Sequence, residues 1–322
     1  MSEAIVTPAP VSASAPAAHA TNPVAREPLQ YQADPLADAT IAEVIGPWAH
    51  SLTDASAADL IAQHASHWQN IARANSLMAT WTSNASINGW GPGDGVADDH
   101  VTRALATYLQ SGKALPDWAD AAKIDRAEEL FMEYGALSCL LLFCASLPEC
   151  YVLPDLAAVL HIAGQLEQHT EYRIRSTAAM IFPVMMRGGL TDPEGAGVSQ
   201  TLKVRLIHAT IRNLILRGNP EQSVLALQSE VGDSASGDDV AAMGVVPVLA
   251  SLAGVRNMHQ ALFAHGWKTG QDGLPCNQEE LAYTLLTFSY VFLRGLRTLG
   301  LGLKPADEDA YLHAWNVMAH VL

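Results

Sequence analysis

One histidine, His208, stands in a segment where apolar and basic residues alternate at helical spacing. On an α-helix, at about 100° per residue, three apolar residues fall on one side of His208: Val204, Ile211 and Ile215. Arg205 and Arg212, three residues before it and four after it, fall on its other side. The spacing therefore places one imidazole between an apolar strip and two guanidinium groups.

Two interpretations fit this arrangement. A flat apolar ring that carries two carboxylates and needs one nitrogen ligand would fit it, and haem is such a molecule. An ordinary amphipathic helix with one buried histidine and two surface arginines would show the same spacing. The chain contains twelve histidines, and histidines have many roles other than ligation, so the pattern alone favours the second interpretation.

A second candidate pair is Arg173 and Thr177, which lie one helical turn apart and share a face. Such a pair could position a small polar ligand or dioxygen beside a metal, although the same spacing is common on ordinary helices. Three histidine pairs do not indicate a metal site. An amphipathic helix explains His64 with His67, and the six-residue spacing of His259 and His265 is not a recognised ligand spacing within a helix. Packing explains His313 with His320. The signatures of nucleotide-binding loops, serine hydrolases and zinc peptidases are absent from the sequence.

Composition limits the function classes. The 322 residues are 49% hydrophobic and only 16% charged, which is typical of a globular chain with a substantial core. The formal charge of −15 argues against a nucleic-acid surface and against docking on anionic lipid, since both need basic faces. The four cysteines show neither zinc nor disulfide spacing.

The organisation along the chain indicates one domain. Residues 1–33 are rich in Ala, Pro and Ser and predict a disordered arm, whereas residues 34–322 predict a single all-helical domain. There is no targeting signal, and the most apolar run, from Gly135 to Leu147, is too short to span a bilayer, so a cytoplasmic protein without a membrane span is expected. The oligomeric state is left open.

Helical periodicity dominates, and no strand pattern competes with it. The segment that opens at Asp125 and Glu128 resembles a capping box, and it predicts a long buried central helix that ends at Pro148. Glycines predict a loop over residues 89–95. The other predicted helices cover residues 55–78, 155–167, 171–186, 200–217, 240–265, 277–300 and 305–322.

The last of these helices has no stop signal, and Trp315, Met318 and Leu322 are still in register where the sequence ends. We therefore expect a chain shortened at its C-terminus, with these apolar side chains partly uncovered.

Several blocks of sequence, in order, resemble one family: residues 127–135, 143–148, 173–177, 203–212, 274–281, 284–289 and 311–315. This is the family of haem b-dependent oxygenases that includes the bacterial rubber oxygenases (latex clearing proteins) and the fungal mycophenolic-acid pathway oxygenase. The resemblance covers roughly residues 115–322. It implies a globin-like all-helical core that holds haem b.

The resemblance also implies roles for the residues singled out above. His208 would be the axial iron ligand, Arg205 and Arg212 would pair with the haem propionates, and Arg173 and Thr177 would lie on the distal side. Haem would activate dioxygen, and the substrate would be a small apolar molecule of the alkene or isoprenoid kind, oxidised or oxidatively cleaved.

Two positions depart from the rubber-cleaving members. Ser176 replaces a lysine that serves there as a second axial ligand, so a sixth position on the iron that is open or filled by water is expected. Ala157 stands where a catalytic glutamate is expected, and the nearest acids are Glu149 and Asp155. Two alternatives stay open: a non-catalytic haem protein, such as a gas sensor or carrier, and a cofactor-free helical interaction protein.

Overall fold

The computed structural model describes residues 28–47, 57–93, 95–153, 159, 170–217 and 267–322, and the regular elements in these ranges are helices. Strand-like pairing there is confined to an isolated bridge between Gly93 and Val96. This confirms the predicted all-α class, while the globin-like arrangement stays a prediction. The elements are η1 (Leu29–Tyr31), α1 (Pro35–Ile45), α2 (Ala57–Met78), α3 (His100–Gly112), α4 (Ala121–Tyr134), α5 (Ala136–Leu141), the π-helix η3 (Leu142–Ser146), α6 (Leu147–Glu149), α9 (Thr170–Met185), α10 (Gly197–Arg217), α13 (Thr269–Asp272), α14 (Gln278–Thr298) and α15 (Pro305–Val321).

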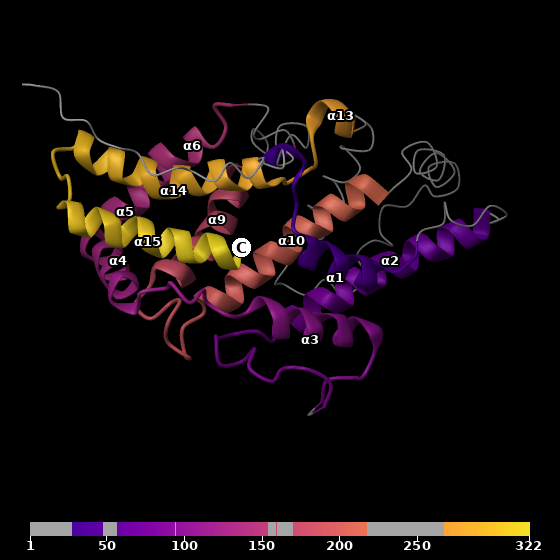
Figure 1. The fold of residues 1–322 in the computed structure, drawn as a ribbon. Coiled ribbons are helices and arrows are strands. Elements are labelled where there is room, and N and C mark those ends of the chain that lie inside the picture. Colours follow the sequence, from indigo (N-terminus) through magenta and orange to yellow (C-terminus); the bar gives the residue numbers. More distant parts are fainter. Residues whose placement is uncertain (1–27, 48–56, 94, 154–158, 160–169, 218–266) are drawn as a thin grey trace, which may run out of the picture.

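Helix α10 crosses the middle of the described structure and separates two groups of helices (Figure 1). On one side α15 packs against α4 and α14, and α14 also contacts η3 and α5. On the other side α1 packs against α2 and α3. Because α10 contacts α1, α9 and α15, it joins the two groups, and a residue on α10 can meet groups from both.

The core between α4, α14 and α15 is aromatic. Phe292 and Tyr311 stack with ring centroids 4.7 Å apart, and Phe288 and Trp315 stack at 6.1 Å. Phe288 and Phe292 are four residues apart on α14, as are Tyr311 and Trp315 on α15, so each helix presents one aromatic stripe to the other.

The prediction of one long central helix is wrong in two respects: where the helix begins and whether it is continuous. Helix α4 begins earlier, at Ala121, because the Asp120 carboxylate accepts hydrogen bonds from the backbone N–H groups of Ala122 and Lys123. It then ends at Gly135, whose φ of 44° favours glycine, and the chain turns by 90° into Ala136–Glu149. Glu128 is not a cap; it is fully buried and binds another segment.

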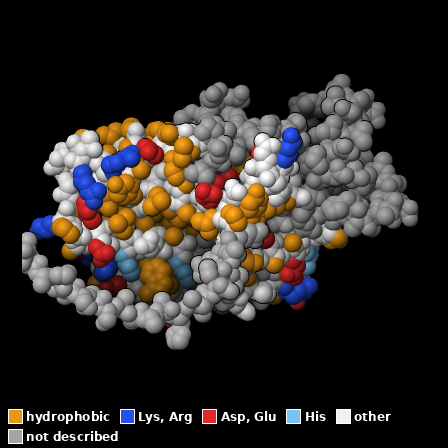
Figure 2. Space-filling model, turned by 45° about the horizontal axis from the view of Figure 1, so that its top comes forward, with side chains coloured by type: hydrophobic (Ala, Val, Ile, Leu, Met, Phe, Trp, Pro, Cys, Tyr) orange, Lys and Arg blue, Asp and Glu red, His pale blue; other side chains and the backbone are white. Residues whose placement is uncertain are grey.

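The segment after Gly135 is also less buried than predicted. Leu140 on α5 is 55% exposed, and further exposed apolar side chains, among them Leu286 and Tyr290, lie on α14. Figure 2 shows a broad band of hydrophobic side chains among scattered charges on this side of the molecule. Within the described ranges no single helix is long and apolar enough to cross a bilayer; the bent pair of α4 with Ala136–Glu149 meets that test only when its two halves are joined.

The other predictions divide into three groups. The helices predicted at 55–78, 171–186, 200–217, 277–300 and 305–322 are confirmed as α2, α9, α10, α14 and α15. Most of 155–167 and all of 240–265 lie outside the described residues. Helices α1 and α3 were not predicted, although each begins after an aspartate, Asp34 and Asp99, whose side chain caps it.

The structure bears on two predictions about the ends of the sequence. Trp315 and Met318 are 2% and 0% exposed, so the expected lack of cover over them is wrong, and only Leu322 of the three is partly exposed. Of the predicted arm, residues 28–33 are described: Gln30 and Gln32 accept backbone hydrogen bonds from Leu274 and Gln278 through their carbonyl oxygens.

Candidate functional site

Helix α10 carries the candidate residues, and one asparagine fixes where it begins. The Asn84 Oδ1 atom accepts hydrogen bonds from the backbone N–H groups of Val198 (3.0 Å) and Ser199 (3.3 Å), in the first turn of α10. Its amide nitrogen donates to the carbonyl oxygens of Gly189 and Asp192, both at 2.9 Å. Because the helix leaves its first N–H groups without intrahelical acceptors, Asn84 supplies from a distant loop the cap that α10 needs.

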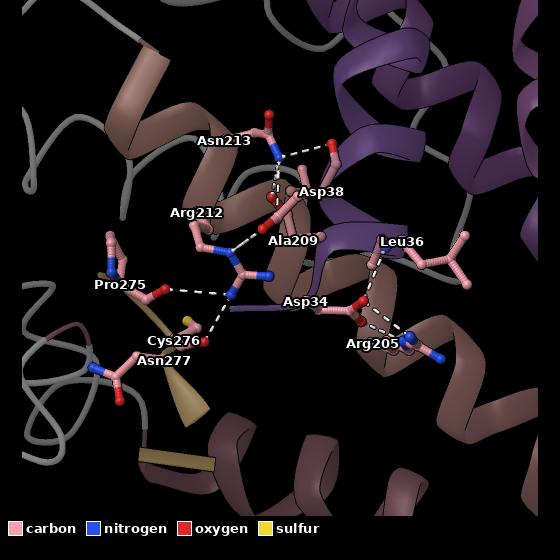
Figure 3. A network of polar contacts seen from close by, with 12 residues as sticks. Asp34, Leu36, Asp38, Arg205, Ala209, Arg212, Asn213, Pro275, Cys276 and Asn277 are labelled. Carbon is pink, nitrogen blue, oxygen red and sulfur yellow. Dashed lines mark hydrogen bonds and ion pairs between the residues drawn. The ribbon is translucent and has the colours of Figure 1, made fainter. Parts of the chain in front are cut away.

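Arg205 pairs with Asp34, the residue that caps the start of helix α1. Its Nε and Nη2 atoms donate to the two carboxylate oxygens of Asp34 (Figure 3), and the second contact measures 2.9 Å. Its Nη1 donates to the Val321 carbonyl oxygen at 3.2 Å. The guanidinium carbon also lies 5.7 Å from the ring centroid of buried Tyr108. All three side-chain nitrogens of Arg205 therefore have acceptors within the chain, two of them in a fork geometry that arginine favours.

Arg212, seven residues further along α10, also pairs with an aspartate of α1 (Figure 3). Its Nε lies 2.8 Å from both carboxylate oxygens of Asp38. Its Nη1 donates to the carbonyl oxygen of Cys276 at 2.7 Å and to that of Pro275 at 3.4 Å. Arg212 is only 2% exposed, so these contacts compensate a charge that is nearly removed from water.

The loop that meets Arg212 has an unusual backbone. Cys276 has a φ of 51°, the left-handed region that side-chain-bearing residues rarely adopt, and it is the single such case outside glycine in the described part of the chain. Asn277 follows as the N-cap of α14 and forms a capping box with Glu280, so the predicted start of this helix is confirmed. In this backbone conformation the Cys276 carbonyl oxygen accepts a hydrogen bond from Arg212, and the Cys276 side chain packs with Ile215.

Three carboxyl groups at this junction have shifted pKa values. Burial raises the pKa of Asp34, but the hydrogen bonds from Arg205 and the Ala37 N–H outweigh it and hold that pKa below its usual range. Burial raises the pKa of Asp38 more than Arg212 lowers it. Burial also raises the pKa of Glu280 to about 8, so this carboxyl is largely neutral at pH 7.

His208 lies on α10 between the two arginines in sequence. It is half-buried, and its Nδ1 atom is shielded from solvent. The apolar strip beside it is present as predicted: Val204 and Ile211 are half-buried and Ile215 is buried. Ile211 and Ile215 pack in a small apolar cluster with Val159, Cys276 and Trp267. The histidine therefore has an apolar flank and is only partly exposed to solvent.

The distal pair lies on helix α9, which packs against α10. Thr177 is half-buried, whereas the side chain of Arg173 falls outside the described residues. Of the acids near the expected glutamate position, Glu149 pairs with Arg294 at 2.8 Å, and Asp155 and Ala157 lie outside the described residues. The roles of Arg173 and Thr177 thus stay predictions.

The remaining histidines have structural contacts where they are described. His67 is buried and its Nε2 lies 2.9 Å from the Pro47 carbonyl oxygen. His313 and His320 flank the ring of Trp118, and His313 accepts the Asp120 N–H. In the described ranges no three His, Cys, Asp or Glu side chains are grouped to hold a metal ion. The other ligands of an iron at His208 would therefore have to come from a bound group such as a porphyrin ring.

Asp34 and Asp38, which hold the two arginines, were missed at the level of sequence. A signal for them existed: Asp34 followed by Pro35 is a preferred start for a helix, with an acid at the cap and proline in the first turn. Four residues separate the two aspartates, so both fall on one face of α1. Their pairing with α10 had no local signal, because the partners lie 171 and 174 residues away.

Comparison with known proteins gives three matches. Residues 247–322 match the family model described as the catalytic domain of the ER-bound oxygenase mpaB/B' and rubber oxygenase. A rubber oxygenase from Streptomyces sp. (strain K30) is 23% identical over 252 residues, which are 77% of this chain and 47% of that protein. The chain thus spans about half the length of this curated relative.

The third match is structural. A structure of latex clearing protein in the closed state superposes with a TM-score of 0.56 and 19% identity, over 91% of this chain and 59% of that one. At this identity the match demonstrates a shared helical fold. The family model, the curated relative and the shared fold agree with the blocks of sequence that resemble the rubber oxygenases.

Proposed function

We propose that this chain is a haem b-dependent oxygenase that uses dioxygen to oxidise or oxidatively cleave an apolar substrate of the alkene or isoprenoid kind. The observation that carries the proposal is His208, a half-buried imidazole beside an apolar strip on the central helix of a fold shared with latex clearing protein. The family match supports the reaction class, since the matching family model is that of an oxygenase catalytic domain.

The residues around His208 fit haem in part. A half-buried imidazole is a suitable nitrogen donor, and Val204 and Ile211 offer apolar contact to a flat ring. Bound haem would supply the iron that binds and activates dioxygen, which protein side chains do not. Arg205 and Arg212 do not fit the predicted propionate contacts, because Asp34 and Asp38 already occupy them.

The chain's own residues would do three things in this reaction. His208 would hold the iron through one nitrogen, and the stiffness of α10, capped by Asn84, would fix the orientation of its ring. The apolar flank of His208 would exclude water and favour an apolar substrate. Thr177, on the neighbouring helix α9, would offer a hydroxyl to a small polar ligand such as dioxygen.

A spectroscopic experiment tests this proposal. The purified chain, reconstituted with haem, is expected to show a Soret band and about one haem per chain in a pyridine haemochrome assay. His208→Ala is expected to lose stable haem binding, whereas His64→Ala, on helix α2, is expected to keep it. A normal Soret band in His208→Ala would refute the assignment of the ligand.

The same experiment separates the alternatives. The alternatives are a cofactor-free interaction protein and a non-catalytic haem protein. The absence of a Soret band in the reconstituted wild-type chain would establish the former. Haem binding without oxygen consumption in the presence of isoprenoid substrates would establish the latter.

A further inference from the structure

Two arginine–aspartate pairs join α10 to the start of α1. Asp34 and Asp38 lie on one face of α1, and Arg205 and Arg212, seven residues apart, lie on one face of α10. Figure 3 shows the two pairs side by side, with the Cys276 carbonyl oxygen completing the contacts of Arg212. We call these two pairs the α1 clasp.

The clasp is balanced in charge. Two guanidinium groups face two carboxylates, and Glu280, the next carboxyl group of this junction, is buried in its own capping box. Two further carboxylates, such as those of a haem, would therefore bring negative charge to a clasp whose two guanidinium groups are already matched by carboxylates. In a partly desolvated setting such an excess is unfavourable.

The clasp is also difficult to open. The side chain of Asp34 is 9% exposed and that of Arg212 is 3% exposed. Replacing either aspartate by an outside carboxylate would leave a buried charge without its partner, which costs more than the new contact returns. Asp34 is further held as the N-cap of α1 by the Ala37 N–H at 3.1 Å.

We propose that Asp34 and Asp38 are the permanent partners of Arg205 and Arg212, so that the α1 clasp positions α10, and that the site at His208 selects its ring without using these arginines for the ring's carboxylates. The second half of this proposal rests on the proposed function. It makes a neutral ring ester as good a ligand as the free acid.

The first experiment tests the clasp without any cofactor. Unfolding by urea is measured for the wild type, Asp38→Asn, Arg212→Gln and the double variant, and the exposed pair Asp98–Arg103 serves as the control. Each buried single variant is expected to raise the unfolding equilibrium constant about tenfold or more, and the double variant to be no worse than either. The control pair is expected to couple by less than about fivefold. Additive effects at Asp38 and Arg212 would overturn the clasp.

The second experiment tests ligand selection. Haem b and its dimethyl ester are titrated into the wild-type chain and into Asp38→Asn, and affinity is followed by the Soret band. The wild type is expected to bind both rings within about threefold, whereas Asp38→Asn, with a freed guanidinium, is expected to shift toward the free acid by about tenfold. An ester bound more than about tenfold weaker by the wild type would show that the arginines serve the propionates.

The two failures are distinguishable. If neither ring binds, the proposed haem function fails while the unfolding measurement still decides the clasp. If both rings bind but the pairs do not couple, the haem function stands and the clasp fails.

Discussion

Replacement of Glu280 by glutamine should make this protein more stable at alkaline pH and leave it nearly unchanged at acidic pH. Glu280 is 7% exposed, and its Oε2 accepts the Asn277 N–H at 3.2 Å in the capping box of α14. Glutamine retains an oxygen that can accept the same hydrogen bond. The substitution therefore removes an ionisable proton while the cap is kept.

The sign follows from proton linkage. Burial raises the pKa of Glu280 from 4.5 to about 8 in the folded state. Between these two values the folded chain holds a proton that the unfolded chain releases, so the contribution of Glu280 to stability is greatest below about pH 4.5 and falls as the pH rises toward 8. The slope approaches about 1.4 kcal/mol per pH unit, and the total approaches an upper bound of about 5 kcal/mol.

The assay is urea unfolding at pH 4.5, 6, 7.5 and 9, with the free energy of unfolding compared between Glu280→Gln and wild type. Glu279→Gln is the matched control, because it removes an exposed carboxylate from the same helical turn. The stabilisation by Glu280→Gln is expected to grow from near zero at pH 4.5 to several kcal/mol, about 2–5, at pH 9. A difference that stays constant over this pH range would refute the reasoning.

Two further predictions concern the start of α10. Asn84→Ala removes two accepted and two donated hydrogen bonds and should lower the free energy of unfolding by about 2–4 kcal/mol in urea titrations, whereas Asn88→Ala, which loses only an exposed contact from Lys113, should cost less than about 1 kcal/mol. Gly189→Ala would place a Cβ atom 2.3 Å from the Pro183 carbonyl oxygen and should lower the melting temperature by about 10 °C or more, while at Gly91 the nearest atom would be 3.5 Å away and the same change should have little effect. Equal effects of either pair of variants would contradict the contacts described.

Local signals in the sequence located the helices whose first turn carries a capping box or a proline. The Asn277–Glu280 box and Pro305 each act within one turn, so the starts of α14 and α15 could be predicted closely. The side of α10 that carries Val204, Ile211 and Ile215 was also accessible, since helical periodicity alone determines it.

The rest depended on contacts between distant segments. The Asp125–Glu128 pattern looked like a cap, but Glu128 is buried in mid-helix and accepts the Gly188 N–H at 2.6 Å, a partner 60 residues away. The turn at Gly135 lies inside a continuous apolar run, where periodicity has no means of marking a corner. For the arginines, local spacing showed correctly that they share a side of the helix, but not that α1 would meet them.

The long sequence separation of the α1 clasp has a consequence for synthesis of the chain. During translation α1 leaves the ribosome first, and Arg205 and Arg212 follow only after 171 and 174 further residues. At about 5–20 residues per second this is a delay of roughly 10–35 s. Over that interval Asp34 and Asp38 lack their arginine partners, and α1, an eleven-residue helix that is only marginally stable alone, can pack only against α2 and α3. Docking of α1 onto α10 is therefore a late event in folding, and a nascent chain shorter than about 210 residues cannot make it.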